Sequence, residues 1–329
     1  MSGPSSPAGP AKAVLILFDS LPLTSLGCYG GFRERTPGFD RLAARGAIFE
    51  NALTPRVSGG ASAFGADGPW SDSWNDARSR LEQGVAIREV CCTTPHALVD
   101  AVAPEAVQPW LESDETGVLA ITAPELLSAP VHSHLAAIDE AIGRLFDLVS
   151  ERPDQNTLLV VAALLSHPAG LDFPRLRAGA INVPLLLWSP ALPEPGIRHS
   201  ELVLVTDLLP TIARWLGRDL PDAGLDLLEP VRDDVELGRV DVRTEGLGEV
   251  ALRTGSHHLV MDAAASNDGA VHAAGDRRVA LFAKPGDAWD ELDVGGTMPD
   301  VRRDLVERCD AVTTSPAPSL DASPGQPGV

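Results

Sequence analysis

The sequence predicts an α/β fold, in which a doubly wound, mostly parallel sheet flanked by helices is followed by a small antiparallel subdomain. Short apolar runs alternate with amphipathic segments between residues 12 and 245, a pattern typical of a sheet covered by helices on both faces. After residue 245 the pattern changes to short alternating strands and one final helix. A chain of 329 residues is long enough to bury a sizeable core in this arrangement.

Four apolar runs are expected to form buried parallel strands, because each is short and ends in polar or turn-forming residues. They span residues 14–18, 118–122, 157–164 and 183–188. Polar Asp19 follows the first run directly. In a parallel sheet ligands gather beyond the carboxyl ends of the strands, so Asp19 is a candidate metal or substrate ligand.

The clearest helix is expected at 134–151, where apolar residues repeat about every 3.6 positions and leave Asp139 for solvent. A second helix is expected at 206–217, with Thr206 as its N-cap and Gly217 at its end. Asp40 is expected to cap the helix that contains Leu42.

The domain organisation follows from composition and periodicity. The main α/β domain is expected at 12–245 and the antiparallel subdomain at 246–312, with strands in 249–263 and 277–283 and a helix in 298–312. Residues 1–11 and 313–329 are rich in Pro, Ser, Gly and Ala and are expected to be disordered tails. The stretch 61–109 has weak periodicity, and 65–79 is interpreted as a loop.

Charge and cysteine content limit the classes of partner. Acidic residues number 46 against 26 basic ones, and the net charge of −20 opposes binding to phosphate backbones or anionic lipids. Nucleic acid and membrane are therefore excluded as expected partners. The cysteines (Cys28, Cys91, Cys92 and Cys309) lack zinc-site spacing, so reduced thiols are expected. The N-terminal apolar run is interpreted as a strand rather than a signal sequence, which predicts a cytoplasmic protein.

Residues 16–55 resemble the N-terminal block of the sulfatases, within the alkaline phosphatase superfamily. The positions that fit this block are Thr36, Pro37, Asp40, Leu42, Ala43, Gly46, Phe49, Asn51 and Ala52. Stretches 132–167, 181–221, 251–260 and 281–305 resemble later blocks in the same order, with Asp139, Ile142, Gly143, Asn156 and Thr157 matching in the first of them. Residues 57–115 match no block and are interpreted as a shortened, divergent region.

The resemblance implies an ester hydrolase with one divalent cation, usually calcium, held by an Asp-Asp pair and a later Asp with Asn or His. The first pair reads Asp19 and Ser20 in this chain, and the later pair reads Ser166 and His167. One of three carboxylates therefore remains, and Asp19 with His167 is a poor calcium cage, since an imidazole suits zinc or nickel better.

The nucleophile that the resemblance implies is also missing. Sulfatases use a formylglycine formed in a C/S-x-P-x-R signature, but neither Ser58 nor Ser62 has Pro or Arg at the required spacing. Only two lysines exist to stabilise an anion, Lys12 and Lys284, and neither lies in the middle of the chain. Losing one such group typically costs about a hundredfold in rate.

These departures predict a sulfatase-like protein that is catalytically inactive, needs no cofactor and acts as a binding or regulatory partner. An active sulfuric or phosphoric ester hydrolase remains an alternative, with Asp19, Ser58, His167 and Asp172 around a divalent or transition metal. A homo-oligomer, or pairing with an active paralogue through the C-terminal subdomain, also stays open. Structural roles compete with each assignment: Asp19 as a cap, His167 as a backbone-bonded residue and Ser58 as an ordinary loop serine.

Overall fold

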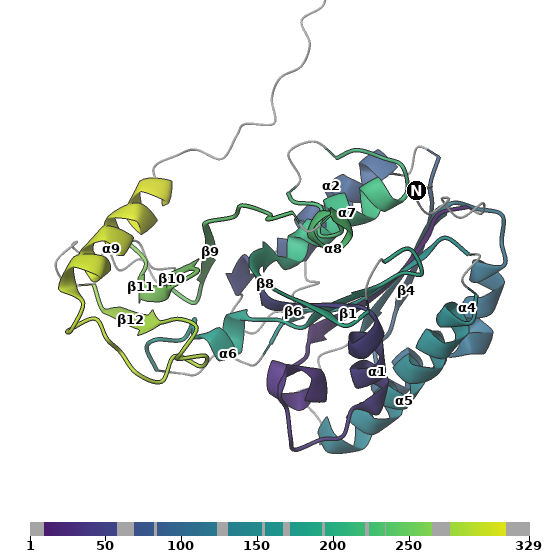
Figure 1. Cartoon of the computed structure of the whole chain (residues 1–329), viewed down its shortest axis with the longest axis horizontal. Helices are drawn as coiled ribbons and strands as arrows, with labels where there is room; N and C mark the ends of the chain where they lie inside the picture. The colour runs from purple at the N-terminus through teal and green to yellow at the C-terminus, as the bar shows by residue number, and fades with distance from the viewer. Residues whose placement is uncertain are drawn as a thin grey trace, which may run out of the picture.

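Seven strands form the main sheet of the computed structural model, in the order β4-β5-β1-β6-β7-β2-β8 (Figure 1). The structure describes residues 10–57, 69–81, 84–123, 131–152, 155–166, 172–192, 195–220, 224–233, 235–264 and 277–313. The strands are β1 (Lys12–Ser20), β2 (Ala47–Leu53), β4 (Ala86–Cys91), β5 (Gly117–Ala123), β6 (Thr157–Leu165), β7 (Leu185–Trp188) and β8 (Ile197–Leu204).

The predicted strands are present, but one runs in the unexpected direction. β1 pairs in parallel with β5 and β6, and β2 pairs in parallel with β8. β7, predicted as a parallel strand, is antiparallel to both of its neighbours. The reason is its connection: in the described part of the chain between β6 and β7 the single-turn helix α6 (Ala178–Ile181) is the only helix, and that part holds no long crossover helix to return the chain to the other end of the sheet.

Helices cover both faces of this sheet (Figure 1). On one face lie α1 (Pro37–Arg45), α3 (Pro95–Ala101), α4 (Pro104–Leu111) and α5 (Val131–Ser150). The other face carries α2 (Pro69–Leu81), α7 (Leu208–Trp215) and α8 (Glu229–Asp233). The fold class predicted from the sequence is therefore confirmed. Among the described residues, no helix is both long and apolar enough to cross a membrane.

A second sheet of five strands packs at the side of the main sheet, in the order β12-β11-β10-β9-β3. Its strands are β3 (Arg56–Val57), β9 (Asp241–Gly246), β10 (Glu249–Thr254), β11 (His257–Asp262) and β12 (Val279–Ala283). All neighbours are antiparallel except β3, which joins β9 in parallel and comes from the chain directly after β2. The final helix α9 (Pro299–Thr313) packs against β10 and β11.

The two sheets share a hydrophobic cluster. Leu53 of the main sheet and Ile181 of α6 lie in one buried cluster with Val242, Ala251 and Val260 of the second sheet. Apolar burial of this kind fixes the second sheet against the end of the main sheet. The end of β2 is thus covered by the second sheet.

Two local predictions about helices were wrong. The stretch 65–79, interpreted as a loop, contains most of α2, which buries Trp74, Ala77 and Leu81. Thr206 does not cap the later helix, because a short 3-10 turn (Val205–Asp207) precedes α7. Polar composition hid the helix in the first case, and an unpredicted turn shifted the helix start in the second.

Asp139, and not Asp40, caps α1. Asp139 was predicted to face solvent, but it is buried and its carboxylate accepts hydrogen bonds from Gly38 N at 3.0 Å and Phe39 N at 2.9 Å. Asp139 therefore caps α1 from the neighbouring α5, whereas Asp40 lies inside the first turn of α1. Burial raises the pKa of Asp139, opposed by the two backbone N–H groups.

Candidate functional site

The carboxyl ends of β1 and β6 bring three of the candidate residues together. The two strands are parallel neighbours, and Ser20 lies opposite Leu165 in the register. Asp19, Ser20 and Ser166 therefore lie at the same edge of the sheet, as expected for strand tips in an α/β fold. All three side chains are buried, with 5%, 3% and 2% of their residue surface exposed.

Ser20 and Ser166 join the two strand ends to each other. Ser20 Oγ donates a hydrogen bond to the backbone oxygen of Ser166 at 2.6 Å. Leu21 N donates to Leu165 O at 3.1 Å, and Leu23 N lies 3.4 Å from Ser166 Oγ. Both serine hydroxyls are therefore used in the connection between β1 and β6, which is a structural role.

Among the other predicted site residues Ser58, His167 and Asp172, the structure describes Asp172, which is exposed. His167 and Ser58 lie outside the described residues. His96, the histidine of the divergent region, makes an edge-on ring contact with His134, with the ring centroids 5.8 Å apart.

The described residues at this edge do not fit a calcium ion. Calcium takes six to eight oxygen ligands, and carboxylate charge sets much of its affinity. Asp19 supplies the carboxylate among Asp19, Ser20 and Ser166, and the Ser20 hydroxyl already donates to a carbonyl. Within the part of the chain that the structure describes, no three His, Cys, Asp or Glu side chains gather as a metal site.

Both lysines of the chain are buried elsewhere. Lys12 Nζ donates to backbone oxygens at the carboxyl end of α4, at the opposite end of β1 from Asp19. Lys284 Nζ lies 2.6 Å from Asp290 Oδ1 and donates to Asp287 O and Ala288 O. Neither ammonium is available to bind an anionic ester at the edge of the main sheet.

A surface hollow of about 290 Å³ lies between α1 and the beginning of β8. It is lined by Cys28, Asp40, Ala43, Gly196 and Arg198, among others. Burial raises the pKa of the Cys28 thiol to about 12, and the carboxylate of Asp40 adds to the effect. A thiol with a raised pKa forms less thiolate, so burial makes Cys28 a poorer nucleophile than an exposed cysteine.

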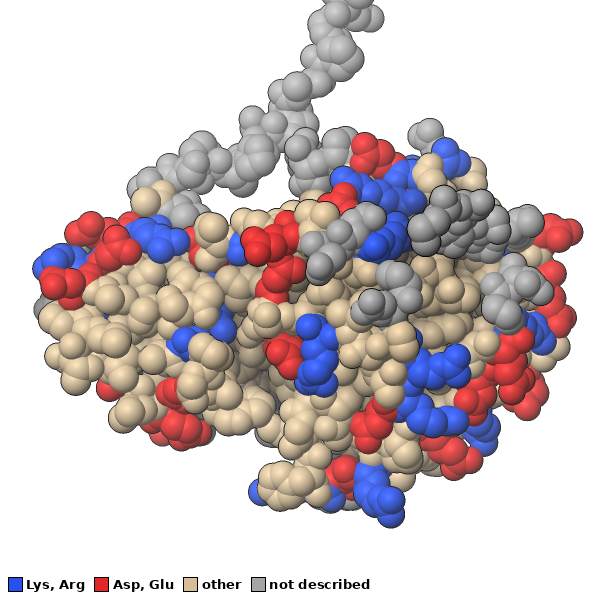
Figure 2. Space-filling model, viewed as in Figure 1, with Lys and Arg blue, Asp and Glu red and all other residues tan. Residues whose placement is uncertain are grey.

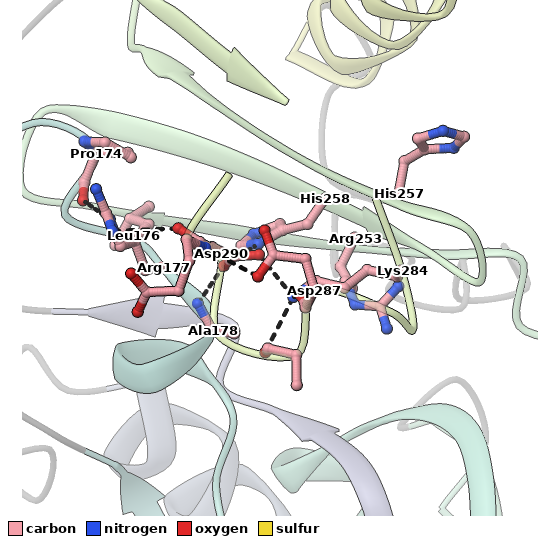
Figure 3. Close-up of polar contacts among 12 residues, drawn as sticks. Pro174, Leu176, Arg177, Ala178, Arg253, His257, His258, Lys284, Asp287 and Asp290 are labelled. Atoms are coloured by element: carbon pink, nitrogen blue, oxygen red, sulfur yellow. Dashed lines mark hydrogen bonds and ion pairs between the residues drawn. The ribbon is translucent and has the colours of Figure 1, made fainter. Parts of the chain in front are cut away.

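A second group of polar residues, centred on Asp290, was not predicted from the sequence (Figure 3). His258 Nδ1 lies 2.8 Å from Asp290 Oδ2, and both residues are fully buried. Such a pair resembles a catalytic dyad, but a substrate cannot reach a fully buried pair. The residues come from β11 and from the loop after β12, and no motif in the sequence links them.

Comparisons with known proteins find structures of the same fold, but they find no family model and no curated relative. A solved structure from a Bacteroides thetaiotaomicron locus for glycosaminoglycan metabolism is similar over 94% of this chain and 100% of its own, at 14% identity and a TM-score of 0.69.

Two further structures extend this likeness. The phosphonate monoester hydrolase of Agrobacterium radiobacter is similar over 92% of this chain and 95% of its own, at 13% identity and a TM-score of 0.62. An alkaline phosphatase superfamily protein of Vibrio parahaemolyticus is similar over 92% and 85%, at 14% identity and a TM-score of 0.63. The chain has the fold of the sulfatases and the alkaline phosphatase superfamily, as its sequence predicted.

Proposed function

We propose that this chain, which has the sulfatase fold, is catalytically inactive and acts as a binding or regulatory partner. The observation that carries the proposal is the contact of Ser20. Its hydroxyl donates to Ser166 O at 2.6 Å, at the strand end where a metal-dependent hydrolase would need a second carboxylate. A serine adds no negative charge, so the single carboxylate of Asp19 would hold a divalent cation weakly.

The charge of the chain supports the same proposal. Hydrolysis of a sulfate or phosphate ester needs cations that stabilise the anion as it develops. Both lysines are buried in other contacts, and the net charge of −20 repels anionic esters. Figure 2 shows a face that is mostly tan, on which red acidic and blue basic side chains lie near one another in scattered groups. This charge also supports the proposal that nucleic acid is no partner.

One observation favours the alternative, an active ester hydrolase with an unconventional metal site. Asp19 is a buried carboxylate at the edge where α/β proteins bind their ligands. In this alternative Asp19 acts with Ser58, His167 and Asp172. The two proposals differ in a measurable way, because the hydrolase requires a stoichiometric metal ion.

We expect the purified protein to hold no stoichiometric divalent metal and to turn over no ester, because Asp19 is the one carboxylate among Asp19, Ser20 and Ser166. The measurement is metal content by mass spectrometry after dialysis against calcium, zinc, nickel or manganese. Turnover of aryl sulfate, aryl phosphate and aryl phosphonate is followed on the same samples. Asp19→Asn is compared with Asp40→Asn, whose carboxylate lies in the first turn of α1 and lines the hollow between α1 and β8.

The inactive assignment is wrong if one metal ion per chain is bound and both metal and turnover are lost in Asp19→Asn but kept in Asp40→Asn. Equal, background-level turnover in all three proteins supports it. A metal that binds equally to both variants lies elsewhere on the chain and also leaves the assignment standing.

We propose further that a second copy of this chain pairs with the first through the loop between β12 and α9. This loop exposes Trp289 by 40% and Leu292 by 67%, three residues apart. The buried Asp290 and the bonds from Glu291 N and Leu292 N to Asp287 hold the loop in place. Rigid, exposed aromatic and aliphatic side chains are typical of interface centres.

Light scattering coupled to size exclusion tests this pairing. We expect a dimer whose fraction rises with salt, because added salt screens the repulsion between two chains of charge −20. The double change Trp289→Ser and Leu292→Ser should give a monomer with the thermal midpoint of the original chain. Val240→Ser, which changes another exposed apolar side chain, is the control. A monomer at every salt concentration, or a dimer unaffected by the double change, contradicts the pairing.

A further inference from the structure

The carboxylate of Asp290 holds two parts of the chain that are far apart in sequence. Oδ2 accepts a hydrogen bond from Ala178 N at 2.5 Å and lies 2.8 Å from His258 Nδ1. Lys284 Nζ forms an ion pair with Oδ1 at 2.6 Å. Figure 3 shows these groups around one carboxylate, between the second sheet and the start of α6.

Asp290 is held in this position at a conformational cost. Its φ is +61°, in the left-handed region that residues other than glycine seldom adopt. A fully buried carboxylate is also costly unless cations and hydrogen bonds surround it. Arg177 adds a further bond, from Nη1 to Asp290 O at 3.1 Å. A residue with a costly backbone conformation persists only where its surroundings fix it, and here those surroundings are the bonds to the Asp290 carboxylate and backbone oxygen.

A second carboxylate of the same sheet holds the preceding residues. Glu249 of β10 accepts hydrogen bonds from Arg175 N at 2.7 Å and Leu176 N at 3.1 Å, and Arg175 Nε lies 2.9 Å from it. Three backbone N–H groups between Arg175 and Ala178 therefore bond to side chains of the second subdomain. This stretch, residues 172–178, is called the connecting segment below.

The connecting segment follows β6, one of the two strands of the candidate site, and leads to a contact with the chain after β2. It leads from β6 and Ser166 to α6, whose last carbonyl, Ile181 O, accepts a hydrogen bond from Thr54 N at 3.0 Å. Thr54 O in turn accepts a bond from Thr244 Oγ1 of β9 at 2.7 Å. The second sheet thus fixes the chain that follows β2 and the chain that returns from β6.

We propose that Asp290 is a positioning residue, which locks the connecting segment against the second sheet through Ala178 N and which, when removed, frees that segment while both sheets stay folded. The proposal does not depend on catalysis, since it concerns the order of the segment beside the edge. Asp290, His258, Lys284 and Ala178 are called the latch.

The latch is closed at neutral pH. Burial raises the pKa of Asp290, but the nearby His258 and Lys284 outweigh it, so the pKa lies below its ordinary value of 3.8. An acid with a lowered pKa stabilises the folded state above its ordinary pKa, and that contribution is lost as the pH falls through the lowered value. Arg253 of β10 also faces Asp290 and adds to the positive surroundings.

Hydrogen exchange of the full chain, followed by mass spectrometry, tests the proposal. In Asp290→Asn we expect amides of residues 175–182 to exchange about tenfold faster or more, because a charge-assisted bond to this segment is lost. Amides of β10 and of the main sheet should keep their rates. Asp262→Asn is the control, since Asp262 is equally buried in β11 but bonds to Arg278 within the second subdomain.

A second variant removes the hydrogen-bond donor of the latch, Ala178 N, and keeps the charges of Asp290, His258 and Lys284 in place. Ala178→Pro removes the N–H that Asp290 accepts, and proline is tolerated at the first position of a helix. Arg177, with φ −69° and ψ 162°, already has the conformation required before proline. The same local increase is expected. Unchanged exchange of 175–182 in either folded variant, or an equal increase over the whole second sheet, overturns the proposal.

Discussion

Replacing Asp207 with alanine is expected to lower the free energy of unfolding by about 3–5 kcal/mol, the range for removing one partner of a buried ion pair. Only 1% of the residue's surface is exposed. Its carboxylate forms an ion pair with Arg239 and accepts hydrogen bonds from Leu204 N at 2.7 Å and Leu225 N at 3.2 Å. Alanine leaves these donors without an acceptor, and Arg239 is itself largely buried.

Urea unfolding followed by circular dichroism measures this loss, and Asp219→Ala is the matched control. Asp219 lies in the same region, but its side chain is 77% exposed and 3.9 Å from Arg214. An exposed pair of this kind contributes at most about 1 kcal/mol. If both variants unfold at the same urea concentration, the contacts of Asp207 are not the source of stability that the structure implies.

The main sheet was predictable from sequence because a strand buried on both faces is an unbroken apolar run. The runs at 14–18, 118–122 and 157–164 became β1, β5 and β6 with small changes of boundary. The direction of β7 was not predictable, since a run of apolar residues does not indicate whether the strand is parallel or antiparallel to its neighbours. Its direction depends on the short path through α6, which holds one turn of helix.

The helix α2 had a usable signal. Trp74, Ala77 and Leu81 are spaced three and four residues apart, as one face of a helix requires, but Ser, Asp and Asn between them gave the composition of a loop. The caps had no such signal. Asp139 lies a hundred residues after the helix that it caps, so local rules assigned that cap to Asp40 instead.

The candidate site was predicted only in part, for a similar reason. The strand tips that hold Asp19, Ser20 and Ser166 follow from the apolar runs before them. The contact between the two serines depends on the register of β1 and β6, which the sequence does not encode locally. The group around Asp290 joins it to His258, which lies 32 positions earlier in the chain, and to the start of α6. Its histidine is one of two adjacent histidines in an ordinary strand.

The two lysines show that the presence of a cation in the sequence does not place it at the candidate site. In the sequence they are candidate cations for an anionic ligand, and in the structure each fixes a turn of backbone. Lys12 Nζ donates to Trp110 O at 3.0 Å, Ser113 O at 2.7 Å and Glu115 O at 2.9 Å. It also lies 4.8 Å from the centre of the Trp110 ring. A cation at the carboxyl end of α4 is favoured by the helix dipole.

Lys12→Met is therefore expected to destabilise the chain by about 2 kcal/mol, because methionine fills the space but leaves the carbonyls at the end of α4 without their donor. Thermal unfolding monitored by calorimetry measures the loss. Arg88→Met is the control, since Arg88 also lies over the Trp110 ring but its ion pair with Glu115 is more than half exposed. An equal, small effect of both variants would mean that the ring contact, and not the carbonyl bonds, is what Lys12 contributes. A larger effect of Lys12→Met alone assigns the stabilisation to the buried ammonium, and so removes it from any role in binding an ester.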